Sequence, residues 1–135
     1  MIGIDTNVLM RFVLQDDAQQ SKQAKAFFFQ LSESNKGFLS VTTIVESVWV
    51  LESTYKLTRT QVGEFLRWLL NARELVLEQP MCVGEAIRLY AIGADFADAL
   101  IACAGRAAGC KTTVSFDRGA IKYAHMSPVP EYRQT

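Results

Sequence analysis

The chain has 135 residues, and its 14 basic side chains balance its 14 acidic ones, so its formal net charge is zero. This balance argues against a protein held to nucleic acid by overall charge, although it leaves room for a local basic groove. With 50% hydrophobic and 21% charged residues, the composition is that of a globular protein rather than a disordered one. No apolar stretch approaches the roughly 18 residues that a membrane-spanning helix needs.

Short apolar runs alternate along the chain with segments of helical periodicity. We expect strands at residues 2–4, 38–41, 75–77 and 112–115, and a last extended piece near Met126. We expect helices at residues 8–14, 18–34, 42–55, 58–70, 80–90 and 95–108, and a short turn of helix from Gly119. This order predicts one α/β domain over residues 1–135, a three-layer α/β/α sandwich with a mainly parallel sheet of four to five short strands. We expect residues 127–135 to form a loosely ordered tail.

Capping and stop signals in the sequence mark the ends of one predicted helix, and the cysteines bear on the redox compartment. Asp17 can cap the helix that follows it, and the segment Asn35-Lys36-Gly37 is typical of a helix stop. Cys103 and Cys110 lie among apolar residues, so we expect small core residues rather than ligands or disulfide partners. This expectation fits a reduced, cytoplasmic compartment. The single histidine, His125, is expected at the surface or half-buried.

Four carboxylates follow predicted strands or begin predicted helices. They are Asp5, Glu46, Asp98 and Asp117. If the strands are parallel neighbours, these acids meet at the carboxyl edge of the sheet, where such folds bind ligands. Two carboxylates about 4 Å apart repel by roughly 4 kcal/mol at an effective dielectric near 20, so four together need bound cations. Oxygen ligands without a histidine cluster or cysteine pair favour Mg²⁺ or Mn²⁺ over zinc.

Each acid also has a purely structural interpretation. Glu46 could close a capping box with Thr43 at a helix start. Asp95 could cap the helix in whose first turn Asp98 favours the positive end of the helix dipole. The remaining two acids could simply lie in turns.

Four segments of the chain carry a resemblance to a known family. They are Ile4-Asp5-Thr6-Asn7-Val8-Leu9, Thr43-Ile44-Val45-Glu46, Asp95-Phe96-Ala97-Asp98-Ala99-Leu100-Ile101-Ala102 and Thr113-Val114-Ser115-Phe116-Asp117. In order and spacing they resemble the PIN domain over essentially the whole chain, and more narrowly the VapC toxins of bacterial toxin–antitoxin pairs. The resemblance implies an α/β/α sandwich, an endoribonuclease that depends on Mg²⁺ or Mn²⁺, and an antitoxin partner that blocks the site.

The resemblance also implies roles for individual residues. The metal-binding and catalytic quartet would be Asp5, Glu46, Asp98 and Asp117, with Asp5 and Asp98 as the firmest direct ligands. The supporting residues would be Asn7, Asp95 and Ser115. Of these, Ser115 could orient Asp117 or a bound water. Many relatives carry a second acid or a Phe after the last Asp, where this chain has Arg118.

An RNA substrate and protein partners would each need a binding surface, and the sequence offers candidate residues for both. Candidate RNA-binding residues are Arg11, Lys111, Arg118 and Lys122, each of which could instead be a solvated surface charge. The large apolar residues Trp49, Phe65 and Trp68 either fill the core or form a homodimer face or a groove for an antitoxin helix.

Three other functions fit part of the pattern. A phosphatase of haloacid-dehalogenase type also begins with an Asp after its first strand, but it uses a second Asp two residues on, where this chain has Asn7. An RNA-binding PIN module without catalysis would gain nothing from four clustered acids. A structure-specific DNA nuclease of related fold would need additions for which the chain is short.

Overall fold

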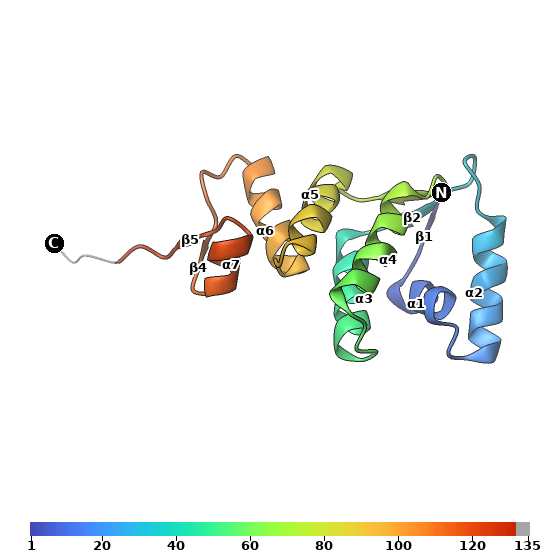
Figure 1. The fold of residues 1–135 in the computed structure, drawn as a ribbon. Coiled ribbons are helices and arrows are strands. Elements are labelled where there is room, and N and C mark those ends of the chain that lie inside the picture. The colour runs from blue at the N-terminus through green and yellow to red at the C-terminus, as the bar shows by residue number, and fades with distance from the viewer. Residues whose placement is uncertain (132–135) are drawn as a thin grey trace. The chain divides into compact units, whose positions relative to one another are not determined.

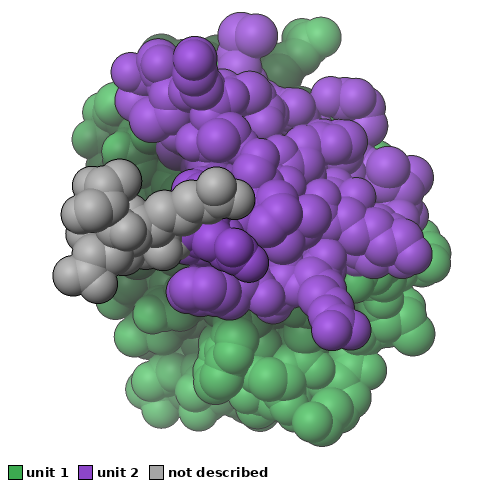
Figure 2. Space-filling view, turned by 90° about the vertical axis from the view of Figure 1, so that its left-hand side faces the viewer, with its two compact units in different colours: residues 1–80 green, residues 81–135 purple. Residues whose placement is uncertain are grey.

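A computed structural model of the protein describes residues 1–131 (Figure 1). The chain falls into two compact units, residues 1–80 and residues 81–135, which Figure 2 shows in different colours. Each unit has its own helices and its own set of parallel strands.

The first unit is built around three parallel strands. Its elements are β1 (Ile2–Gly3), α1 (Thr6–Leu14), α2 (Ala18–Gln30), β2 (Gly37–Leu39), α3 (Val41–Ser53), α4 (Arg59–Asn71) and β3 (Leu75–Leu77). The strands pair in the order β1-β2-β3. Helix α1 packs against α2 and α3, and α4 packs against α3 and β3. Because β1 and β2 are parallel, α1 and α3 both begin at the carboxyl edge of this sheet.

Apolar side chains from the sheet and the helices fill the core of this unit. The fully buried ones include Leu9, Leu39, Ile44, Leu51, Val62 and Leu66. Phe12 and Phe28 join α1 to α2 with their ring centroids 4.2 Å apart, and Trp68 of α4 packs beside both rings. Phe65 is also buried, whereas Trp49 is 63% exposed. The core interpretation is therefore right for Phe65 and wrong for Trp49.

Side chains set the start of α2 as predicted but end the helix earlier than predicted. The Asp17 carboxylate accepts a hydrogen bond from the Gln20 backbone N–H at 2.9 Å and caps α2. The helix ends at Gln30, four residues before the predicted end. Ser32 and Asn35 close a tight turn there, because the Ser32 hydroxyl accepts from the Asn35 N–H at 3.2 Å. Serine hydroxyls compete with helical backbone bonding in this way. Gly37 belongs to β2 and is not a helix stop.

The second unit has three helices and a pair of parallel strands in its described part, residues 81–131. Its elements are α5 (Pro80–Ala91, whose first residue closes the first unit), α6 (Phe96–Ala107), β4 (Val114–Ser115), α7 (Arg118–Tyr123) and β5 (Ser127–Pro128). Strands β4 and β5 pair with each other, and α7 packs against α6 and β4. A small core joins Ala102, Ala120, Ala124 and Met126. Gly109, with φ of 95°, follows the end of α6 as predicted.

The structure confirms a mixed α/β fold with short parallel strands. Within residues 1–131, five strands pair as a set of three in the first unit and a set of two in the second. The predicted tail over residues 127–135 contains β5, and its last four residues lie outside the described part of the chain. The prediction of a single domain over residues 1–135 stays a prediction.

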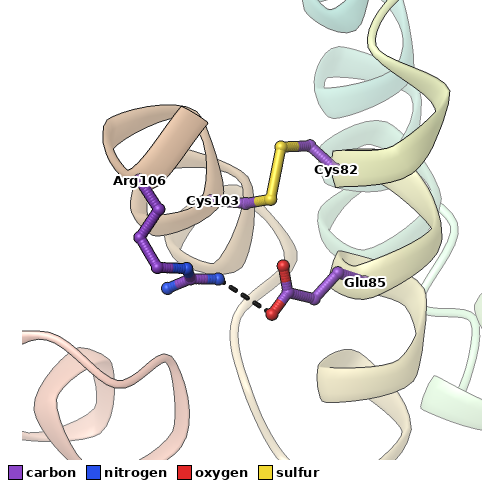
Figure 3. Close-up of a disulfide and its surroundings, with 4 residues drawn as sticks. All are labelled: Cys82, Glu85, Cys103 and Arg106. Atoms are coloured by element: carbon purple, nitrogen blue, oxygen red, sulfur yellow. Dashed lines mark hydrogen bonds and ion pairs between the residues drawn. A yellow bond between two sulfur atoms is a disulfide. The ribbon is translucent and has the colours of Figure 1, made fainter. Parts of the chain in front are cut away.

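A disulfide in the second unit corrects the expectation for the cysteines. Cys82 of α5 and Cys103 of α6 are bonded, with their Cα atoms 5.6 Å apart (Figure 3). Arg106 and Glu85, one turn further along the same two helices, form an ion pair at 2.8 Å. Cys110 is free and exposed rather than buried. The prediction failed because apolar neighbours in sequence do not show which helix faces meet.

Candidate active site

Asp5 and Glu46 line one pocket in the first unit. The backbone N–H of Ile4 donates to the Phe38 carbonyl at 2.9 Å, which extends the pairing of β1 with β2 up to Asp5. Glu46 lies in the second turn of α3, the helix that follows β2. The pocket has a volume of about 280 Å³. Its lining residues are Asp5, Thr6, Asn7, Met10, Arg11, Glu46, Val50 and Tyr55. Asp5, Asn7 and Glu46, all predicted for the site, therefore face the same hollow.

Glu46 does not cap α3, so its structural interpretation is wrong. The Ser40 hydroxyl accepts a hydrogen bond from the Thr43 N–H at 3.1 Å, and the Glu78 carboxylate accepts one from the Val41 N–H at 2.8 Å. These two side chains satisfy amides of the first helical turn, which have no partner within the helix. Glu46 lies beyond that turn and is exposed. Its carboxylate therefore adds charge to the pocket without serving the helix end.

Asp5 does have a structural role beside its place in the pocket. It is the N-cap of α1, and its side chain accepts a hydrogen bond from the Thr6 N–H at 2.8 Å. A carboxylate has two oxygens with about four lone-pair sites, so a single bond leaves capacity for a ligand. The capping contact holds the side chain at the end of β1, where it faces the pocket.

The second unit carries the other predicted acids at two helix starts. Asp95 is the N-cap of α6 and accepts from the Asp98 N–H at 2.9 Å, so its capping interpretation is confirmed. Asp98 lies half-buried in the first turn of that helix. Asp117 caps α7 and accepts from the Ala120 N–H at 3.0 Å. The Ser115 hydroxyl accepts from the Asp117 N–H at 2.9 Å, a contact that orients the backbone of Asp117.

The charges of this second group act on one another. Burial raises the pKa of Asp98, and the nearby carboxylates of Asp95 and Asp117 raise it further. Repulsion of this kind is what a site built to hold a cation shows when its acids are close together. Asp98 and Asp117 of the predicted quartet are therefore electrostatic neighbours, and the capping residue Asp95 lies beside Asp98.

The donor set of both groups fits a hard divalent cation. Every acid in the two groups offers carboxylate oxygen, and Asn7 adds an amide oxygen, which are the ligands that Mg²⁺ and Mn²⁺ prefer. Among residues 1–131, no three side chains of His, Cys, Asp or Glu are grouped closely enough to hold a metal ion. Asp5 and Glu46 belong to the first unit, and Asp98 and Asp117 to the second. A shared site of all four acids stays a prediction.

The predicted RNA-binding residues differ in their surroundings. Arg11 lines the acidic pocket and pairs with Asp16. Arg11 also lines a neighbouring hollow of about 510 Å³ between β1, α1 and α2, to which Asp5 and Asn7 contribute. In the second unit Lys111, Arg118 and Lys122 are exposed, and the Lys122 ammonium lies 5.1 Å from the ring centroid of Tyr123.

Sequence reasoning missed one residue that lines the pocket, Tyr55, and its hydrogen-bond partner Asp16. Tyr55 lines the pocket and donates its hydroxyl hydrogen bond to Asp16, which lies 39 positions earlier in the chain. Neither residue belongs to a motif, and a contact between the end of α3 and the α1–α2 turn leaves no signal in local spacing. His125 is exposed, as expected.

Comparison with known proteins places the chain in a family. The family model of the PIN domain matches residues 2–126, so the chain belongs to the PIN-domain family. The chain is 32% identical to a VapC ribonuclease of Aquifex aeolicus (strain VF5) over 117 residues, which cover 85% of this chain and 86% of that protein. No solved structure matches the chain significantly.

None of the helices in residues 1–131 is both long enough and apolar enough to span a bilayer.

Proposed function

We propose that the protein is an endoribonuclease, the toxin of a VapBC-type toxin–antitoxin pair, and that it depends on Mg²⁺ or Mn²⁺. The observation that carries this proposal is the pocket lined by Asp5, Asn7 and Glu46 at the carboxyl edge of the first sheet. The mutually repelling acids of the second unit and the likeness to a VapC ribonuclease support it.

In this proposal the four acids act together. Asp5 and Asp98 would hold the principal cation, and Glu46 and Asp117 would help to hold it or a second ion. When bound, such a cation polarises the phosphoryl group and lowers the pKa of a bound water. Asp95 and Ser115 keep the first turn of α6 and the start of α7 in place through the hydrogen bonds described above. The donor set contains no group that must form a covalent intermediate with RNA.

RNA cleavage by purified protein tests the proposal. We expect cleavage that requires Mg²⁺ or Mn²⁺ and that stops with a chelator. Asp5→Ala and Asp98→Ala should each lower the rate at least about 100-fold, because loss of even an outer partner of a metal ligand costs about 10- to 100-fold. Glu33→Ala removes an exposed acid that pairs with Arg73, and should leave cleavage unchanged. Full activity in either aspartate variant would refute the assignment.

The rival functions predict other results in the same assays. Turnover of a generic phosphomonoester without RNA cleavage would favour a phosphatase of haloacid-dehalogenase type. Tight RNA binding without cleavage under any divalent metal would favour a PIN module that has lost catalysis. Asn7, which lies in the pocket where the phosphatase needs an acid, speaks against the first rival. The acidic residues in each unit argue against the second rival, the PIN module that has lost catalysis.

We also propose an antitoxin partner, a homodimer and a cytoplasmic location. The likeness to a VapC ribonuclease supports this location, whereas the disulfide removes the argument from the cysteines. The exposed side chain of Trp49 on α3 supports a protein-binding face, because tryptophan is enriched in protein–protein interfaces relative to the rest of the surface. Light scattering after size-exclusion chromatography tests the dimer. Co-purification with the product of a small adjacent gene tests the antitoxin. Trp49→Ala should weaken one of these associations and leave RNA cleavage by the isolated protein intact.

A further inference from the structure

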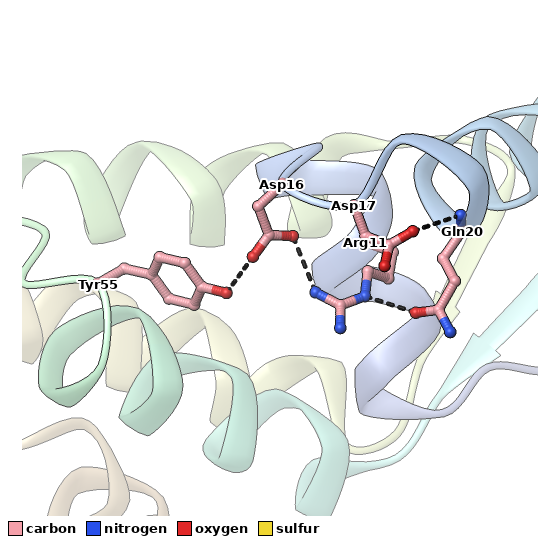
Figure 4. Close-up of polar contacts among 5 residues, drawn as sticks. All are labelled: Arg11, Asp16, Asp17, Gln20 and Tyr55. Atoms are coloured by element: carbon pink, nitrogen blue, oxygen red, sulfur yellow. Dashed lines mark hydrogen bonds and ion pairs between the residues drawn. The ribbon is translucent and has the colours of Figure 1, made fainter.

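A basic side chain and a phenol at the rim of the acidic pocket share one carboxylate (Figure 4). Arg11 donates from Nη1 to Asp16 Oδ1 at 2.8 Å and from Nε to Gln20 Oε1 at 2.7 Å. The Tyr55 hydroxyl donates to the other oxygen of Asp16, Oδ2. Asp16 therefore bridges two donors, Arg11 and Tyr55, that both line the pocket of Asp5 and Glu46.

Three separate segments bring these groups together. Arg11 lies in the last turn of α1, and Tyr55 follows the end of α3. Between α1 and α2, Gln15 takes a left-handed conformation with φ of 53°, which reverses the chain and sets Asp16 over Arg11. The next residue, Asp17, is occupied in capping α2. Asp16 is thus the acid that the turn presents to Arg11.

The contacts of Asp16 are those that an anionic ligand would make. The hydrogen bond from Tyr55 and the pairing with Arg11 hold the pKa of the Asp16 carboxyl below its usual value, so the group is ionised at neutral pH. A phosphodiester, like a carboxylate, presents a pair of oxygens that share one negative charge, and guanidinium binds both. In Figure 4 the remaining guanidinium nitrogen of Arg11 points away from Asp16 and Gln20.

Arg11 offsets the negative charge that Asp5 and Glu46 give to the pocket. Asp5 and Glu46 repel an approaching phosphate, and Arg11 supplies the positive charge among the described residues that line the hollow. Arg11 also lines the larger hollow beside β1 and α2, so a phosphate bound to it would lie between the two. The pair of Arg11 with Asp16 is about one-third exposed on each side, and ion pairs of that exposure exchange partners at low cost.

We propose that Arg11 and Tyr55 form a subsite for a backbone phosphate of RNA next to the acidic pocket, and that Asp16 occupies this subsite until the phosphate displaces it. The proposal rests on the proposed function for the identity of the ligand. It makes Asp16 an internal competitor of the substrate rather than a support for Arg11.

RNA binding measured without cleavage tests this subsite. The parent protein carries Asp98→Asn, and fluorescence anisotropy follows a labelled single-stranded RNA oligonucleotide over a range of salt concentrations. We expect Asp16→Asn to tighten binding by about twofold to fivefold, the range set by release of one exposed ion pair. Tyr55→Phe should weaken binding. Arg11→Ala should weaken it and reduce the slope of log affinity against log salt by about 0.7, the share of one phosphate contact to a single strand.

Matched variants separate the subsite from overall charge. Glu33→Gln and Arg73→Ala make equivalent charge changes in the exposed pair that these residues form at 3.8 Å. We expect no change in affinity from either control. Equal tightening by Glu33→Gln and Asp16→Asn, or weaker binding by Asp16→Asn, would overturn the proposal.

Two further outcomes separate this proposal from the proposed function. If the parent binds RNA and all three rim variants bind equally well, the subsite is wrong and the ribonuclease assignment stands. If the parent does not bind RNA at all, both proposals fail. Circular dichroism checks the fold of each variant, and Arg11→Gln, which retains more of the side chain, replaces Arg11→Ala if that variant does not fold.

Discussion

Asp98, for which we propose a role in metal binding, carries an electrostatic cost to the fold. It lies half-buried in the first turn of α6, where the carboxylates of Asp95 and Asp117 repel its charge. Burial is the larger cause of its raised pKa, and the two neighbouring acids add to it. If Asp98 has the proposed role, stability and function make opposite demands on it, as is common in active sites.

Replacing Asp98 by Asn should therefore stabilise the protein at neutral pH. The folded-state pKa of Asp98 lies above its unfolded value, so the contribution of this group to stability is complete below the unfolded pKa, near 3.9. That contribution is lost as the pH rises through the folded pKa. We expect Asp98→Asn to raise Tm at pH 7 by about 1 to 3 °C, a scale reduced by solvent screening. The gain should shrink as the pH falls towards 4.

Thermal unfolding of the two proteins across this pH range measures the effect. Asp17→Asn is a suitable comparison, because Asp17 caps α2 and Asn is an equally good capping residue. A lower Tm for Asp98→Asn at pH 7 would show that Asp98 gains more from its position at the helix start than it loses by repulsion.

For individual residues, the sequence predicted contacts within one helix turn better than contacts between distant parts of the chain. The capping roles of Asp17 and Asp95 followed from position alone, because an N-cap contacts amides only two or three residues away. At the start of α3 the prediction chose Thr43 in place of the equally local cap Ser40. It could not find Glu78, which reaches Val41 from 37 positions away. The partnership of Asp16 with Tyr55 was missed for the same reason.

Among the elements, β2 has the tightest requirement for a small residue. A Cβ atom added to Gly37 would lie 2.5 Å from Ile4 Cδ1 and 3.2 Å from Leu75 Cδ2, side chains of the chain segments on either side of β2. Both neighbours are buried and have little room to move. Glycine at this position therefore leaves room for the side chains of Ile4 and Leu75 beside β2.

Gly37→Ala should consequently destabilise the protein by about 1 to 2 kcal/mol, the usual cost of overpacking a filled core. Gly3→Ala is the matched control in the adjacent strand, because a Cβ there meets no heavy atom within 4 Å. We expect this control to change stability by less than about 0.5 kcal/mol. Urea unfolding of both variants gives the comparison, and equal losses would show that the crowding at Gly37 is relieved by its neighbours.

The disulfide between α5 and α6 should contribute more than any single cap. It joins residues separated by 21 positions, and a loop of that length corresponds to about 3 kcal/mol in the chain-entropy model. Reduction, or the variant Cys103→Ser, should lower the free energy of unfolding by about this amount. The control Cys110→Ser changes an exposed free thiol and should have little effect. Three reactive thiols in the unreduced native protein would contradict the pairing.

Element types were predictable, and their ends were less so. The strand at residues 75–77 and the helix from Pro80 lie where apolar runs and the proline indicate. The end of α2 was misplaced, because its sequence continues to favour a helix while a turn at Ser32 takes over the backbone bonding. The disulfide depends on which faces of α5 and α6 meet, and this packing is a tertiary property.

For the whole molecule, the central expectation is that acids of both units bind one kind of cation. Ligands that bind only the folded state raise its stability by RT ln(1 + [L]/Kd), or about 1.4 kcal/mol at ten times Kd. Mg²⁺ or Mn²⁺ should therefore raise Tm of the native protein. Asp5→Asn and Asp98→Asn, one in each unit, should both reduce this increase. Glu33→Gln should retain it.

Calorimetric scans with and without the metal measure these shifts. A full increase in Asp5→Asn with none in Asp98→Asn would assign the cation to the second unit alone. The reverse pattern would assign it to the pocket of Asp5 and Glu46. Either pattern would contradict joint action of the four acids while leaving RNA cleavage to be measured separately.

The exposed thiol of Cys110 makes the separation of the two units measurable. With the other two cysteines joined to each other, a maleimide dye should attach at this position alone. Both tryptophans, Trp49 and Trp68, belong to the first unit, whereas Cys110 belongs to the second. Energy transfer from the indoles to an acceptor dye on Cys110 would then act as a spectroscopic ruler, which could be followed as metal, RNA or a protein partner is added.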